Sequence, residues 1–160
     1  MSTTGKPSPL LRANAITELT AFVFNHPLNP NSEIHLRSLS TMTGLQRVGI
    51  SIGRVPPEKE SFVYHFHHTE EEFIYILSGR GIAEIGDEEF EVGPGDFMGF
   101  TAPSVGHNLR NPFDQDLVYL MGGEHRDMEI GEFPRHRKRL IRSRDQFHLA
   151  DDNDLKVFFE

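Results

Sequence analysis

Residues 65–79 read HFHHTEEEFIYILSG, and this stretch decides the fold class because it places metal-binding residue types directly before a strand-like apolar run. Side chains alternate between the two faces of a strand, so we expect His65 and His67 to project from one face with their imidazoles side by side. Glu72 stands immediately before the β-rich run 73–77, from where its carboxylate could reach the same point. The pattern predicts a metal site built on β-structure.

A second stretch offers a further ligand. Residues 93–111 read GPGDFMGFTAPSVGHNLRN and contain His107. His65, His67 and His107 all stand at strand positions where apolar side chains are expected, and a buried polar group needs a partner. Three imidazoles and one carboxylate leave one or two positions open on an octahedral ion, and an open position is what a catalytic metal needs.

The first stretch resembles the first motif of the cupin superfamily. That motif is His-x-His, three or four residues, Glu, six residues and Gly, and the chain matches it with the longer spacer at His65, His67, Glu72 and Gly79. Within the run of three acids at 70–72, only Glu72 leaves six residues before Gly79. The spacing therefore favours Glu72 over its neighbours as the ligand.

The second stretch resembles the second cupin motif, Pro-x-Gly-x2-His-x3-Asn. Pro103, His107 and Asn111 follow it, although Val105 stands in place of the glycine and the stretch from proline to histidine is one residue short. The resemblance covers about residues 45–125 and is to the small, single-domain, metal-binding type-2 cupins. It implies an all-β fold, a cupin-type double-stranded β-helix or jelly-roll barrel. It also implies that one divalent metal ion is bound by His65, His67, Glu72 and His107.

The other histidines are expected to be ordinary packed or surface residues. His68 follows His67 directly, so strand alternation points it away from the proposed metal. Asn111 shares strand parity with His107, and it either supports the ligands or satisfies turn backbone. The remaining members of this group are His26, His35, His125, His136 and His148.

Composition limits the chemistry. A chain of 160 residues is the size of one domain and can bury about two-thirds of its unfolded surface. It contains no cysteine, which excludes disulfides, thiolate metal sites and cysteine nucleophiles. Any metal must take nitrogen and oxygen donors, and iron, manganese, nickel, cobalt or zinc would suit this set.

The net charge of −8 argues against general affinity for nucleic acid. The basic run at residues 135–144 is interpreted as a solvated face balanced by acidic neighbours rather than an anion-binding patch. The first nine residues lack an apolar signal-peptide core, and there is no apolar run of about 18 residues. We therefore expect a soluble, cytoplasmic protein with neither nucleic-acid nor membrane partners.

The chain divides by composition into an N-terminal arm at 1–44, a barrel domain at 45–125 and a C-terminal tail at 126–160 that packs on the barrel or on a partner. Strands are expected at 48–53, 61–68, 73–77, 81–85, 88–92, 97–100 and 116–123. The pair around Gly86-Asp87 is predicted to be a β-hairpin with Phe90 and Val92 facing inward.

Alternation through 61–68 puts Phe62, Tyr64 and Phe66 on the face opposite the histidines. An exposed aromatic stripe of that size is usually covered. We expect the N-terminal arm, the C-terminal tail or a second subunit to cover it, and we predict a homodimer.

Two functions follow from these residues. The first is a metalloenzyme that acts on a small oxygenated metabolite by Lewis-acid or dioxygen chemistry. The alternative is a non-catalytic protein that binds a sugar or organic acid through its metal. Candidates for a further acid or base in the pocket are weak, namely Tyr119, Met121, Asn111 and Met98.

Overall fold

The computed structural model describes residues 7–156, in which antiparallel strands dominate. The largest sheet has six strands in the order β1-β2-β3-β11-β6-β9. Their bounds are β1 Phe22–Phe24, β2 Ile34–Ser38, β3 Val48–Val55, β6 Glu72–Ser78, β9 Phe97–Phe100 and β11 Leu117–Glu124. Strand β11 lies at the centre and pairs along its full length with β3. The first two strands come from the stretch predicted as an arm, so this stretch extends the barrel sheet.

A second sheet closes the barrel, with strand order β4-β10-β7-β8. Its strands are β4 Lys59–Glu60, β7 Gly81–Ile85, β8 Glu88–Val92 and β10 His107–Asn111. The hydrophobic core lies between the two sheets, since it combines Ile76, Leu117 and Tyr119 of the first with Ala83 and Leu109 of the second. The predicted all-β jelly-roll fold is confirmed.

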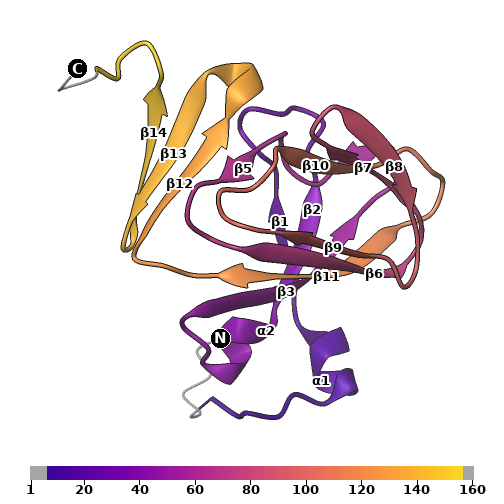
Figure 1. Ribbon diagram of the computed structural model, residues 1–160. Helices are drawn as coiled ribbons and strands as arrows, with labels where there is room; N and C mark the ends of the chain where they lie inside the picture. Colours follow the sequence, from indigo (N-terminus) through magenta and orange to yellow (C-terminus); the bar gives the residue numbers. More distant parts are fainter. Residues whose placement is uncertain (1–6, 157–160) are drawn as a thin grey trace.

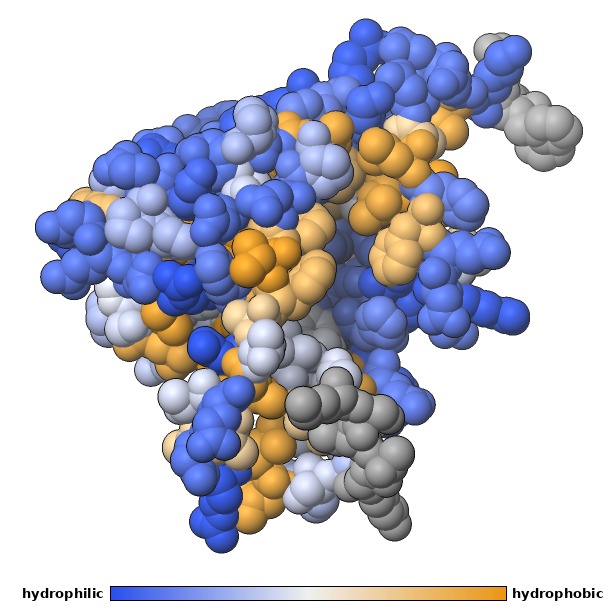
Figure 2. Space-filling view, turned by 180° about the vertical axis from the view of Figure 1, so that it is seen from behind, coloured by the Kyte–Doolittle hydropathy of each residue, from blue (hydrophilic) through white to orange (hydrophobic). Residues whose placement is uncertain are grey.

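The C-terminal tail forms a third sheet that stands beside the barrel (Figure 1). Its order is β14-β13-β12-β5, and its strands are β5 Phe66–His67, β12 Met128–Phe133, β13 Lys138–Ser143 and β14 Gln146–Asp151. Figure 2 shows apolar side chains on this sheet where it borders a hollow beside the barrel. Through β5, the tail is joined directly to the segment that carries the first two histidines. The predicted limits of arm, barrel and tail stay predictions.

The helices are short and lie below the barrel in Figure 1. They are α1 Ala13–Glu18 and α2 Leu39–Thr43, and the tail contains the 3-10 turn η1 Pro134–His136. No helix in the described part is long and apolar enough to cross a bilayer.

Two predicted side-chain orientations are wrong. The strand expected at 61–68 is reduced to β5, because the chain bends through 61–64. Phe62 therefore shares a cavity with His65 instead of lying on the opposite face. Phe90 was expected inward but is 45% exposed, whereas Val92 is buried as predicted.

Two of the three aromatic side chains of this segment, Phe62 and Tyr64, are covered within one chain. Phe24 of the arm lies 5.7 Å from Phe62 between ring centroids. The guanidinium of Arg135, in the tail, sits 4.0 Å above the Tyr64 ring. Arm and tail therefore both contribute, as expected, and the homodimer stays a prediction.

The basic run is balanced by acids, as interpreted from the sequence. Lys138 pairs with Asp151 at 3.0 Å, and Arg139 pairs with Asp152 at 2.9 Å. Arg142 pairs with Glu70.

Candidate metal centre

The predicted ligands come from separate segments that the barrel brings together. His67 lies in β5, Glu72 opens β6 and His107 opens β10. His65 and His107 form an isolated antiparallel bridge. The His65 N–H donates to the His107 carbonyl at 3.0 Å, and the reverse bond is 2.8 Å. The two halves of the sequence pattern are thus held side by side by backbone.

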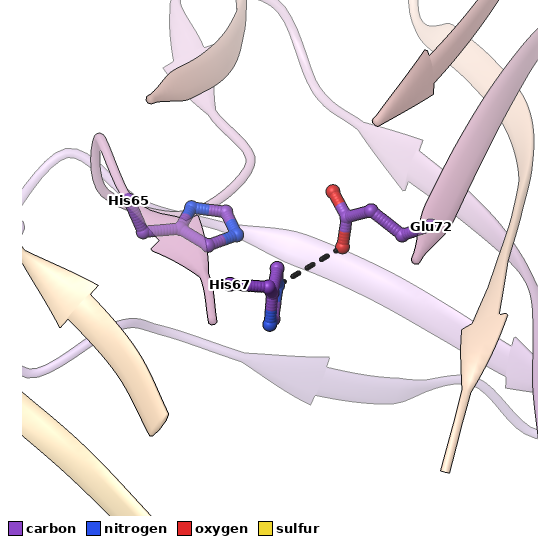
Figure 3. A group of neighbouring side chains, drawn as sticks. All are labelled: His65, His67 and Glu72. Carbon is purple, nitrogen blue, oxygen red and sulfur yellow. Dashed lines mark ion pairs between the residues drawn. The ribbon is translucent and has the colours of Figure 1, made fainter. Parts of the chain in front are cut away.

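The side chains converge. His65, His67 and Glu72 each offer one ligand atom within 4.8 Å of the other two, and Figure 3 shows them projecting toward one another. His67 Nε2 lies 3.1 Å from Glu72 Oε2, and His107 Nε2 lies 2.5 Å from Glu72 Oε1. The ring centroids of His65 and His107 are 4.6 Å apart. All four predicted residues therefore meet at one place, and their role as ligands stays a prediction.

Two of the rings are oriented by backbone carbonyls. His65 Nδ1 donates to the carbonyl of Val63 at 2.7 Å, and His107 Nδ1 donates to that of Val105 at 2.9 Å. Since a carbonyl oxygen only accepts, each Nδ1 carries the hydrogen and Nε2 is the atom available to a metal. Phe100 stacks on the His107 ring at 3.8 Å between centroids, which fixes its plane.

Burial and neighbouring charges shift the pKa values of His65, His67 and Glu72 in different directions. Burial lowers the pKa of His65 to about 3, so its ring is neutral at pH 7. Burial also acts to lower the pKa of His67, but the hydrogen bond to Glu72 and the nearby carboxylates outweigh it and raise that pKa. Burial acts to raise the pKa of Glu72, yet hydrogen bonds from His107 and His67 hold it well below its usual range. Glu72 is therefore ionised.

The group opens onto a cavity of about 220 Å³ inside the barrel. Tyr119 and Met121 line it, as do Phe62 and three of the predicted ligands. Tyr119 is 1% exposed, and burial raises the pKa of its phenol far above the usual value, so it remains protonated.

The other two candidates for the pocket lie elsewhere. Met98 and Asn111 are not among the described residues that line this cavity. The Asn111 amide donates to the carbonyls of Val55 at 2.9 Å and Gln115 at 2.7 Å, and its oxygen accepts from the N–H of Phe113. Of the two roles left open by the sequence, Asn111 takes the one of satisfying turn backbone.

The donor set fits a divalent metal. Neighbouring ligands on one octahedral ion lie about 3.0 Å apart at bonds of about 2.1 Å. The ligand atoms of His65, His67 and Glu72 all lie within 4.8 Å of one another, so their separations would shorten by at most about 2 Å on binding an ion. Three imidazole nitrogens and an ionised carboxylate suit a first-row divalent ion.

Comparison with known proteins gives the family. Residues 51–123 match the family model described as Cupin domain. The chain contains a cupin domain. The matched region contains both halves of the candidate metal centre and ends before β12.

Solved structures resemble this cupin over nearly its whole length. A protein from Acidithiobacillus ferrooxidans, provisionally named a sugar phosphate isomerase, is 35% identical with a TM-score of 0.90, over 96% of this chain and 98% of that one. A cupin-superfamily sugar phosphate isomerase from Silicibacter pomeroyi is 21% identical with a TM-score of 0.81, over 93% and 96% of the two chains, and its likeness shows the fold alone. An uncharacterized protein of Methanocaldococcus jannaschii is 34% identical over 49% of this chain, and this cupin spans 65% of its length.

One buried carboxylate at the site was missed from the sequence. Glu129 of β12 is 5% exposed, and its Oε1 lies 3.4 Å from His67 Nδ1. It belongs to the tail, where no ligand cluster was recognised. The available signal was strand alternation, because Glu129 shares a face with Gly131 and Phe133, which are both buried. His68 points away from the group, as predicted, and its Nε2 lies 2.9 Å from Glu132.

Proposed function

We propose that this cupin is a divalent-metal-dependent enzyme that isomerises a small phosphorylated sugar by Lewis-acid chemistry. The observation that carries the proposal is the convergence of three imidazoles and an ionised carboxylate at the wall of a cavity of about 220 Å³. The substrate class is suggested by the Acidithiobacillus protein, which is 35% identical over nearly the whole chain.

His65, His67, Glu72 and His107 would hold the metal. When bound, a divalent ion supplies an electrophile that polarises a substrate carbonyl or hydroxyl oxygen. The chain provides the surroundings for that chemistry. Tyr119 keeps its proton, so its hydroxyl can donate a hydrogen bond to a substrate oxygen in the cavity.

Isomerisation also needs a group that removes a proton from the carbon next to a carbonyl and returns it to the neighbouring carbon. Among the described residues that line the cavity, Glu124 supplies a carboxylate outside the metal group. The backbone N–H of Glu71 and the guanidinium of Arg126 hold this carboxylate in place. We assign the proton transfer to Glu124.

The same contacts favour a second function. The hydrogen bond from Arg126 lowers the pKa of Glu124, which makes it a weaker base. A protein that holds a sugar on its metal without turning it over needs no base. The alternative is therefore a metal-dependent sugar-binding protein.

One experiment separates these functions. The protein is purified without added metal, its metal content is measured by mass spectrometry, and samples are reloaded with iron(II), manganese, cobalt, nickel or zinc. Each is then incubated with aldose and ketose phosphates in D2O and followed by NMR. An isomerase converts the sugar and incorporates deuterium at the carbon that exchanges its proton.

The expected result is metal-dependent conversion that Glu72→Gln abolishes and Glu71→Gln, an exposed neighbour in the same acidic run, retains. Sugar binding with no deuterium incorporation would establish the alternative. Failure of the wild-type protein to retain any of the five metals would overturn both functions.

A further inference from the structure

Glu129 is a buried carboxylate whose position is fixed by the segment between the metal-binding residues. It accepts hydrogen bonds from the backbone N–H of His68 at 2.9 Å and of Thr69 at 3.0 Å. It also accepts from the Thr69 hydroxyl. A carboxylate that is 5% exposed and held by three donors cannot swing into solvent at low cost.

The ring of His67 lies between two carboxylates. Its Nε2 faces Glu72 at 3.1 Å, and its Nδ1 faces Glu129 at 3.4 Å. The Nδ1 atom is buried and has no hydrogen-bond partner among the described residues. The corresponding Nδ1 atoms of His65 and His107 each donate to a backbone carbonyl. Glu129 is thus the acceptor nearest to the one imidazole that backbone does not orient.

We infer that Glu129 is a positioning residue of the metal centre, which accepts a hydrogen bond from His67 Nδ1–H and so directs Nε2 to the metal. This inference rests on the proposed metal-dependent function. A carboxylate behind a metal-bound imidazole fixes its tautomer and increases its basicity, and removing such a partner typically costs 10–100-fold in metal affinity. The residue lies outside both cupin motifs and beyond residues 51–123.

The C-terminal sheet also holds the rest of the loop between His67 and Glu72. Glu70 is 6% exposed, accepts from the backbone N–H of Arg126 at 2.5 Å and pairs with Arg142 of β13. The tail therefore contacts this loop at two successive places. Glu129 binds the backbone of His68 and Thr69, and Arg126 and Arg142 bind Glu70. The tail forms the outer layer of the metal centre.

The test compares Glu129→Gln with Glu132→Gln. Glu132 is the matched control because it lies on the same strand and contacts His68, which points away from the metal group. The dissociation constant for zinc is measured by chelator competition, and folding is checked by circular dichroism. We expect Glu129→Gln to weaken zinc binding 10–100-fold and Glu132→Gln to leave it at the wild-type value.

A second measurement begins with the wild-type protein, so its first result does not depend on a variant folding. Nitrogen-15 NMR of the zinc-loaded wild-type protein shows which imidazole nitrogen binds the metal. We expect His67 to bind through Nε2, with a downfield Nδ1–H signal that exchanges slowly with water and moves upfield in Glu129→Gln. A purely structural role would not move this signal.

Three results would overturn the inference. They are binding through His67 Nδ1, a Nδ1–H signal unchanged in a folded Glu129→Gln protein, and equal zinc affinity in both variants. In each of these the wild-type protein still binds zinc, so the proposed function survives. If the wild-type protein binds no metal, the proposed function fails and the inference fails with it.

Discussion

Gly79, the glycine of the first cupin motif, is expected to tolerate alanine poorly. It follows β6 with φ of +76°, a left-handed conformation that costs a residue with a side chain about 1–2 kcal/mol. An added Cβ would lie 2.1 Å from the carbonyl oxygen of Asp116 and 3.0 Å from its carbonyl carbon. These are backbone atoms directly before β11, so relief requires β6 to move away from the central strand. We expect Gly79→Ala to lower the free energy of unfolding by about 4 kcal/mol or more.

Gly95 provides the matched control. Its φ is +96°, but no atom lies within 4 Å of an added Cβ. Gly95→Ala should therefore cost only the conformational term of about 1–2 kcal/mol. The difference between the two variants isolates the close approach at Gly79.

The assay is unfolding by urea and by heat, both followed by circular dichroism, since the chain has no tryptophan to report by fluorescence. For a domain of this size, each 1 kcal/mol shifts Tm by about 2–4 °C, so Gly79→Ala should melt well below Gly95→Ala. Equal losses of stability in the two variants would refute the reasoning, because they would show that the contact with Asp116 contributes nothing.

Three further predictions concern charge and metal. The pKa of His65 is about 3 in the folded protein and about 6.5 in the unfolded chain. Between these two pH values the unfolded chain binds more protons than the folded protein. The free energy of unfolding should therefore fall by up to about 1.4 kcal/mol for each pH unit below 6.5. Urea unfolding at pH 7 and 5 checks this, and His65→Gln should flatten the profile. Arg142→Met should cost about 3–5 kcal/mol because it leaves Glu70 buried and unpaired. By contrast, Arg80→Met removes the exposed pair with Glu91 and the guanidinium that lies 4.2 Å above the Phe113 ring, and it should cost only about 1–2 kcal/mol in the same assay. Finally, zinc at 100 times its dissociation constant should raise the free energy of unfolding by about 2.7 kcal/mol in a thermal melt, whereas magnesium, which prefers oxygen ligands, should not.

The sequence predicts the convergence of the site because its spacing is local within each half. His65 and His67 are two apart and Glu72 opens the next strand, so strand geometry alone places them near one another. His107 is brought to them by its antiparallel bridge with His65, which is distant in the sequence. No local sequence pattern predicts this bridge. Its placement was available only from the resemblance of the second stretch to a family motif.

The errors have a common physical cause. Alternation was extended through 61–68, but only β5 at Phe66–His67 is a strand there, and the bend before it turns Phe62 into the cavity. Hairpin alternation placed Phe90 inward, although β8 is the last strand of its sheet and Phe90 is exposed. Period-two patterns predict which residues share a face, but they do not show where a strand breaks or whether an edge strand is covered.

The segment that carries the first two histidines is the least regular part of the site, so side chains must supply the rigidity that a long ladder would otherwise give. Strand β5 has two residues and pairs with β12 alone. The backbone N–H of His67 donates to Ser104 Oγ at 2.8 Å, and the backbone carbonyl of His67 accepts from the N–H of Ser104 at 2.8 Å. The carboxylate of Glu129 accepts from the backbone N–H groups of the next two residues, His68 and Thr69. A metal ligand placed on a flexible segment loses affinity through the entropy of ordering it, and these contacts remove that cost in advance. Half of this support comes from beyond residue 123, so the cupin motif contains the candidate ligands, whereas the C-terminal sheet contributes to how firmly they are held.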